Sequence, residues 1–286
     1  MKKRNLIRLT QEAYGIPHLI TSTSLERILS YLDSRNMGLI DEEDDTEAED
    51  ESKEFSKNGL GYIEVHGAIT YKPVYGMCGE VQGASYIGLF NSVESLVEQG
   101  CKTIVLDFSS PGGQASHIQE YSDAIRKLAD ENDVSLIAYV DEMACSAAYW
   151  LACMCDEVIA NPDAVVGSIG VVVALTDFSK AMDNAGIKRV FITAGSSKVP
   201  FDESGAFKKD FLDKIQKDVN LLNEKFASHV SNYTGLSTET IKELNAESFS
   251  AEDALEIGLI NSILTHSEFA EYIATKHKQK GIKDNA

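Results

Sequence analysis

The chain has 286 residues, of which 43% are hydrophobic and 25% are charged, as in an ordinary globular protein and unlike a disordered one. Its formal net charge is -19, from 26 basic and 45 acidic residues. Most of its surface is therefore expected to repel nucleic acid, whose binding depends on cationic contacts to phosphate. The basic start has no apolar core long enough for a signal peptide, and no window reaches the ~18 apolar residues of a membrane span. We expect a soluble, cytoplasmic protein with neither nucleic acid nor membrane as a partner.

The first segments in chain order are a short arm and an acidic stretch. Over residues 1–40, apolar spacing at Leu25, Ile28, Leu29 and Leu32 predicts one amphipathic helix. Residues 41–54 hold ten acidic residues and one lysine, too much self-repulsion for packed structure, so we predict a disordered linker over 41–58. The linker is read as a solvated tether; a docking arm or a cleavable pro-segment is the alternative.

Residues 59–267 alternate apolar β-rich runs with helical periods, which predicts one α/β domain with a largely parallel sheet flanked by helices. The expected strands are 62–65, 103–108, 135–140, 157–160, 170–174 and 189–193. The expected helices are 86–97, 118–128, a long helix over 207–230 that ends at Thr234-Gly235, 237–244, and one after a capping Ser250. Residues 268–286 are predicted to be a polar tail.

Five cysteines are an odd number, at spacings that match neither a disulfide framework nor a paired zinc site. This favours a reducing compartment. Cys153 and Cys155 lie in the apolar stretch WLACMC, where buried thiols act as small hydrophobic groups. The sequence also lacks GxxxxGK[ST], and no GxGxxG follows a strand. We therefore expect no metal and no cofactor.

Three short segments carry groups suited to catalysis. Ser110-Pro111-Gly112-Gly113 follows an apolar strand, where paired glycines let backbone N–H groups form a nest for an oxyanion, although Pro-Gly-Gly also simply punctuates turns. Ser146 opens an Ala-rich helix after the next strand, a place for a nucleophile or for an ordinary N-cap. None of the six histidines stands in a Ser-His-Asp setting; His66 and His117 are taken as structural or substrate-side.

Lys198 is the third element, in a loop after the expected strand 189–193. A lysine acts as a base only as the neutral amine, which requires burial that brings its pKa from about 10.4 to roughly 7–8. Without that burial it would be an ordinary surface charge.

In order and spacing, LDFSSPGG, DEMACSAAYWLACMCDEVIANPDAVVGSIGVVV and AGSSK resemble the signal peptide peptidase (protease IV) family of Ser-Lys peptidases, over about residues 61–263. Within that family the chain is most similar to the prohead (head maturation) proteases of tailed bacteriophages. The resemblance implies a Clp-protease/crotonase-like fold. It also implies Ser146 as nucleophile, Lys198 as general base, Ser168 as the hydroxyl that orients the base, and the N–H groups of Gly113 and Ala147 as the oxyanion hole.

The resemblance also implies a homo-oligomer, because in single-domain members serine and lysine can come from neighbouring subunits of a ring. The expected function is a serine endopeptidase that cleaves scaffold or capsid-associated proteins, and its own termini, during prohead maturation in the host cytoplasm. Two alternatives stay open: a soluble bacterial peptidase of the same family that degrades peptides, and a non-catalytic assembly protein on the same fold.

Overall fold

A computed structural model describes residues 14–36, 54–75 and 81–283. Its central sheet has the strand order β11-β10-β8-β6-β3-β2, with β9 beside β8 and β12 beside β9. The contacts among β3, β6, β8, β9, β10 and β12 are parallel, and only β2 and β11 pair antiparallel. The strands of this sheet are β2 (Glu54–Lys57), β3 (Leu60–His66), β6 (Thr103–Ser110), β8 (Ser135–Cys145), β9 (Glu157–Ala160), β10 (Val165–Gly167), β11 (Ser248–Ser250) and β12 (Ser262–Ile263).

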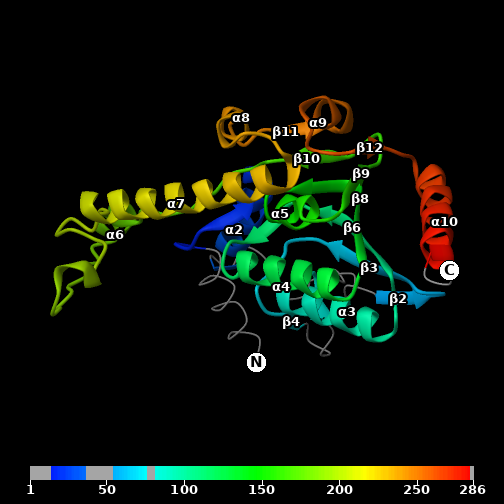
Figure 1. Cartoon of the computed structure of the whole chain (residues 1–286). Coiled ribbons are helices and arrows are strands. Elements are labelled where there is room, and N and C mark those ends of the chain that lie inside the picture. Colours follow the sequence, from blue (N-terminus) through cyan, green and yellow to red (C-terminus); the bar gives the residue numbers. More distant parts are fainter. Residues whose placement is uncertain (1–13, 37–53, 76–80, 284–286) are drawn as a thin grey trace.

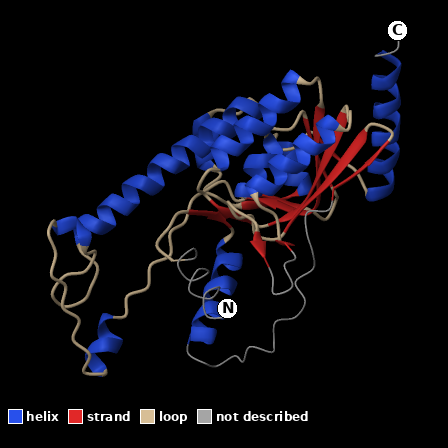
Figure 2. Cartoon of the chain, turned by 90° about the horizontal axis from the view of Figure 1, so that it is seen from below, coloured by secondary structure: helices blue, strands red, loops and turns tan. Residues whose placement is uncertain are grey.

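Helices cover both faces of this sheet (Figures 1 and 2). Most of them gather on one face, and α10 stands on the other side. Two further pairs lie outside the sheet: β1 (His18–Ile20) with β7 (Gly112–Gln114), and β4 (Val74–Tyr75) with β5 (Val81–Gln82). Within the described residues the helices are α2 (Ser22–Asn36), α3 (Tyr86–Glu98), α4 (Ile118–Glu131), α5 (Ala147–Cys153), α6 (Ser179–Asn184), α7 (Lys209–Thr234), α8 (Thr238–Glu243), α9 (Ala251–Ile257), α10 (His266–Lys283) and the 3-10 turn η1 (Ser196–Lys198).

The alternation of side chains along the central strands explains why both faces are covered. On β6, Ile104, Leu106 and Phe108 enter the main core, whereas Val105 points into a second cluster on the opposite face. Such continuously apolar strands are typical of a parallel sheet that is buried on both sides. The expected α/β class with a largely parallel, helix-flanked sheet is confirmed.

The long strand β8 positions the site, because it pairs with two different strands along one edge. Residues 137–140 pair with β9 and residues 143–145 pair with β10. On its other edge β8 pairs with β6 out to Ser110 opposite Ala144. The carboxyl ends of β6, β8 and β10 therefore meet at one place.

Several helices match the sequence analysis closely. The amphipathic helix of the arm is α2, with Leu25 and Leu32 buried. The long helix is α7, which ends at a left-handed Gly235, as glycine C-caps do. Ser250 caps α9 by accepting the N–H of Asp253.

Two expected strands are wrong. Residues 170–174 do not join the main sheet: the strand of this region is β10, and it ends where Ser168 takes a positive φ of 51°. Residues 189–193 form no strand, and there Val190 is 72% and Ile192 98% exposed. An apolar run alone does not tell a buried strand from a segment on the surface.

The expected limits of the linker and the tail also need correction. Residues 54–57, assigned to the linker, form β2 against β3, where Phe55 stacks on Tyr62 with ring centroids 4.9 Å apart. The rest of the acidic run, 41–53, lies outside the described residues. The polar tail is helix α10, because Phe269 and Ile273 on one of its faces are buried against the sheet.

Candidate active site

Ser146 is the single residue between the end of β8 and the start of α5. Its backbone is strained, with φ 56° and ψ -115°, a conformation that costs of order 1–3 kcal/mol and persists only when the surroundings hold it. Its N–H donates to the Gly167 carbonyl at 2.8 Å, and its Oγ donates to the Gly170 carbonyl at 3.3 Å. The hydroxyl makes no capping bond to α5. Ser146 therefore stands at the N-cap position of α5 without capping it through its side chain, and the hydroxyl is held toward the segment after β10.

The Gly112-Gly113 turn lies directly beside Ser146, because the ends of β6 and β8 are paired. Gly112 has φ 106°, and a Cβ there would stand 2.1 Å from the Leu19 carbonyl oxygen and 2.9 Å from that of Cys145. A Cβ on Gly113 would stand 1.9 Å from the carbonyl oxygen of Ile69. Both glycines are thus required by close backbone approach.

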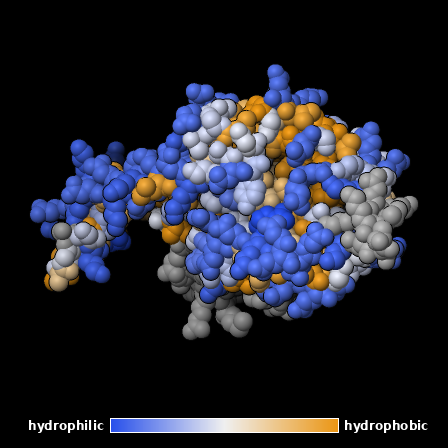
Figure 3. Space-filling model, in the orientation of Figure 1, coloured by the Kyte–Doolittle hydropathy of each residue, from blue (hydrophilic) through white to orange (hydrophobic). Residues whose placement is uncertain are grey.

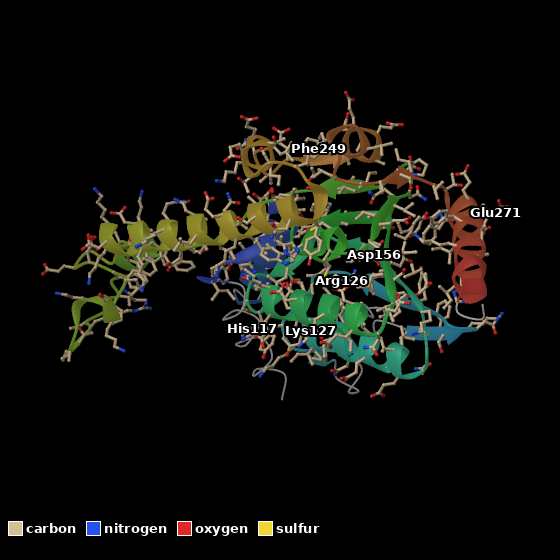
Figure 4. The ribbon with its side chains drawn as sticks, viewed as in Figure 1. His117, Arg126, Lys127, Asp156, Phe249 and Glu271 are labelled. Carbon is tan, nitrogen blue, oxygen red and sulfur yellow. The ribbon has the colours of Figure 1, made fainter. Side chains whose placement is uncertain are left out.

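Ser168 occupies the turn between β10 and the segment that receives the Ser146 hydroxyl. It is half-buried, has a positive φ of 51°, and donates its N–H to the Glu247 carbonyl at 2.7 Å. On β11, Phe249 (labelled in Figure 4) packs against this turn, since a Cβ on Gly167 would meet its ring at 3.0 Å. The turn that carries Ser168 is therefore fixed next to Ser146.

Lys198 is not brought to Ser146 within one chain. It is exposed in η1, in the segment between β10 and α7. This segment, with α6, lies at the far end of α7, away from the sheet (Figures 1 and 2). Residues 175–208 and the first half of α7 are named the projecting arm below. The order and spacing of Ser146 and Lys198 in the sequence match the family pattern, but within one chain the fold keeps the two residues apart.

His117 and Cys145, which lie near the site, have structural surroundings. His117 begins α4 in a left-handed conformation and stacks on Tyr71 with centroids 3.9 Å apart (Figure 4). Burial raises the pKa of Cys145, next to Ser146, to about 11, and its contact with Ser248 opposes this. The Cys145 thiol therefore stays protonated at neutral pH.

Two neighbours of the site were not identified from the sequence. Strand β1 lies across the Gly112-Gly113 turn, with Leu19 opposite Gly113. Val172 bonds to His18 on the other side of β1, N–H to carbonyl in both directions, at 2.8 and 3.0 Å. The sequence feature that could have indicated β1 is the run Ile-Pro-His-Leu-Ile, residues 16–20, before the amphipathic helix. A run of five residues has no periodicity that would assign it a partner.

A cavity of about 210 Å³ lies between residues 169–171, which follow β10, and helix α7. It is lined on one side by Ile169, Gly170 and Val171 and on the other by α7 residues that include Asn223. Gly170, whose carbonyl accepts the Ser146 hydroxyl, is therefore one of the residues that line this cavity.

The strand-to-helix serine, the glycine turn beside it and the mixed parallel sheet define a Clp-protease/crotonase-like protein. The model of peptidase family S49 matches residues 124–280. The chain belongs to peptidase family S49.

Individual relatives extend this result. The chain is 27% identical over 224 residues to the head-tail preconnector protein GP5 of Enterobacteria phage P21, covering 76% of this chain and 43% of that protein. It is 26% identical over 221 residues to the capsid assembly protease C of Escherichia phage lambda, covering 74% and 48%. A probable protease SohB of Haemophilus influenzae is 25% identical over 214 residues, covering 73% and 58%. The chain thus spans about half the length of the phage relatives it matches. Of the helices in the described ranges, none combines the length and apolarity needed to cross a membrane.

Proposed function

We propose that this protein is a serine endopeptidase in which Ser146 is the nucleophile. The observation that carries the proposal is the strained, non-capping Ser146 beside the Gly112-Gly113 turn. In such a site the serine oxygen attacks a peptide carbonyl and forms an acyl-enzyme, which water then hydrolyses. The N–H groups of Gly113 and Ala147 would stabilise the oxyanion, and loss of one such donor typically costs about 2.7–4 kcal/mol of transition-state stabilisation.

The general base in this proposal is Lys198 from a neighbouring copy of the chain. Within one chain Lys198 is exposed on the projecting arm, whereas a lysine base must be enclosed. The arm also exposes apolar side chains, and Figure 3 shows apolar patches at its tip and where it joins the body. These exposed residues include Phe178, Ile187, Val190, Phe191, Ile192, Leu212 and Leu221. An arm with such a surface suits an interface that would enclose Lys198, with Ser168 as its hydroxyl partner.

The substrate in this proposal is a protein of an assembling phage head. The support is the similarity to a phage capsid assembly protease and a head-tail preconnector protein. The resemblance to SohB keeps a general cellular peptidase as the competing assignment.

The first test is co-expression with candidate scaffold and capsid proteins, followed by intact-mass spectrometry. Wild type is expected to trim its partners or itself, whereas Ser146→Ala and Lys198→Ala leave every mass unchanged. Lys127→Ala removes an exposed lysine of α4, outside the projecting arm, and should cleave normally. Cleavage by both site variants would refute the assignment, and cleavage of cellular peptides alone would favour the SohB-like role.

Mixing the two inactive variants tests whether the dyad spans two subunits. If each site takes its serine from one chain and its lysine from the neighbouring chain, both residues are present in about a quarter of the sites of an equally mixed ring. Recovery of about that fraction of wild-type activity is expected. If the mixture stays inactive while the single variants still assemble, the serine and lysine act within one chain.

A further inference from the structure

The segment 15–21 of this chain lies between two other backbone segments at the active site. On one side β1 pairs antiparallel with β7, in the register His18–Gln114, Leu19–Gly113 and Ile20–Gly112. On the other side His18 and Val172 exchange two backbone hydrogen bonds, and the Gly15 N–H donates to the Ala174 carbonyl at 3.1 Å. Peptides commonly bind by adding a strand in this way. The segment therefore has the geometry of a bound peptide.

The carbonyl of Leu19 faces the amide that the proposed mechanism assigns to the oxyanion hole. Thr21 N–H donates to the Pro111 carbonyl, and Ala115 N–H donates to that of Pro17. Hydrogen-bonded pairs alternate along an antiparallel ladder, so the Leu19–Gly113 pair, two residues from each, is also hydrogen-bonded. The Gly113 amide is thus directed at the Leu19 carbonyl, as it would be at the carbonyl of a substrate.

Burial shows how completely the segment fills the site. Leu19 is 0% exposed and belongs to the main core cluster, and Ser146 is also 0% exposed. The Leu19 and Cys145 carbonyl oxygens both lie within 3 Å of the point where a Cβ on Gly112 would stand. The Leu19 carbonyl therefore lies close to the backbone of Cys145, the residue before the proposed nucleophile.

We propose that residues 15–21 are an intramolecular occupant of the peptide-binding groove and keep the site closed until they are displaced. This inference rests on the proposed function, since it places the groove at Ser146. The groove would take an extended peptide with an apolar side chain in the position of Leu19. The occupant is held by the helix that follows it, through buried Leu25 and the hydrogen bond from the Tyr14 hydroxyl to Asp33 at 2.6 Å.

A disulfide between β1 and β7 tests this without using catalysis. His18 and Gln114 form a non-hydrogen-bonded antiparallel pair, in which the Cα atoms are typically about 4.5 Å apart, within the range that a disulfide spans. The variant His18→Cys/Gln114→Cys is made in the Ser146→Ala background of the full chain. Binding of a fluorescent synthetic peptide with the sequence of residues 14–22 is followed by anisotropy, in oxidised and reduced protein.

The oxidised double variant is expected to bind no peptide, and reduction should restore binding to the level of the single variant His18→Cys. Leu19→Ala, which loosens the occupant, should lower the apparent Kd about ten-fold, because affinity scales with the fraction of open grooves. The parent chain with its native cysteines, treated with the same oxidant, is the control for unrelated thiol chemistry. Equal binding by the oxidised and reduced double variant would overturn the inference.

The same lock separates this inference from the proposed function. In the His18→Cys/Gln114→Cys variant with Ser146 restored, the reduced protein should cleave the substrate found in the co-expression test, and the oxidised protein should not. If peptide binding responds to the lock but Ser146 cleaves nothing in either state, the occupant stands and the peptidase assignment fails. If Ser146 cleaves equally well with the lock closed and open, the peptidase stands and the occupant is refuted.

Discussion

His229 on α7 is a buried histidine whose titration should contribute to the acid sensitivity of this fold. Its ring stacks on Trp150 with centroids 4.4 Å apart, and its Nε2 donates to the Trp150 carbonyl at 2.9 Å. A carbonyl only accepts, so the proton is on Nε2. Burial lowers the pKa of His229 to about 4, and the bond to the Trp150 carbonyl opposes this. The folded protein therefore holds this ring neutral.

The sign of the effect follows from comparing folded and unfolded states. The unfolded chain protonates the ring below about pH 6.5, and the folded chain does so only near pH 4, so stability falls as the pH drops through this window. Between about pH 7.5 and pH 5 the loss from this one group is about 2 kcal/mol. Below about pH 4 both states carry the proton and the loss stops growing.

Urea unfolding of wild type and His229→Gln at a series of pH values measures this contribution. Glutamine can still donate to the Trp150 carbonyl but does not titrate. The variant should be less stable at pH 7.5, because the stacking is lost, yet its stability should fall by about 2 kcal/mol less on going to pH 5. His66→Gln, at an exposed histidine, is the control for the loss of a histidine as such. Parallel pH profiles for wild type and His229→Gln would refute the argument.

Three further outcomes are expected from other parts of the molecule. Phe269→Ala, which removes the ring stacked on Tyr139 at 4.0 Å, should lower the free energy of unfolding by about 3 kcal/mol and speed amide exchange in α10, measured by urea unfolding and mass spectrometry. Gly113→Ala forces a methyl group against the Ile69 carbonyl and should destabilise by about 1–3 kcal/mol or more, seen as a lower urea midpoint. Burial raises the pKa of Cys145 to about 11, so iodoacetamide at about pH 8 should alkylate this thiol only in unfolded protein, as mapped by peptide mass.

The central sheet could be predicted because its strands have an unambiguous pattern. The sequence runs 103–106, 135–140 and 158–160, which lie in β6, β8 and β9, are mostly apolar, and the period-3.6 stripes of α3 and α4 precede β6 and β8. Parallel strands in one sheet bring their carboxyl ends to one edge. The meeting of the Gly112-Gly113 turn with Ser146 was therefore within reach of sequence reasoning alone.

The parts that could not be predicted depend on contacts between distant segments. The run 189–193 is as apolar as a strand, yet it lies on the projecting arm with no sheet beside it. The C-terminal helix has a mostly polar sequence, and its docking depends on Phe269, Ile273 and the bonds that Tyr272 and Lys276 make to Glu157. A few anchoring residues do not change the composition of a segment, so composition alone assigned it to a tail.

The two proposals identify separate reasons why a single copy of this chain would be inactive. Closure of the groove by residues 15–21 is a property of one molecule, so its equilibrium does not depend on protein concentration. Supply of Lys198 by a neighbour is an association step and does depend on concentration. Because the Ser146 N–H and hydroxyl donate to the Gly167 and Gly170 carbonyls and not to residues 15–21, opening the groove need not rearrange the nucleophile. Proteolysis would then begin only where assembly raises the local concentration and a competing peptide displaces β1.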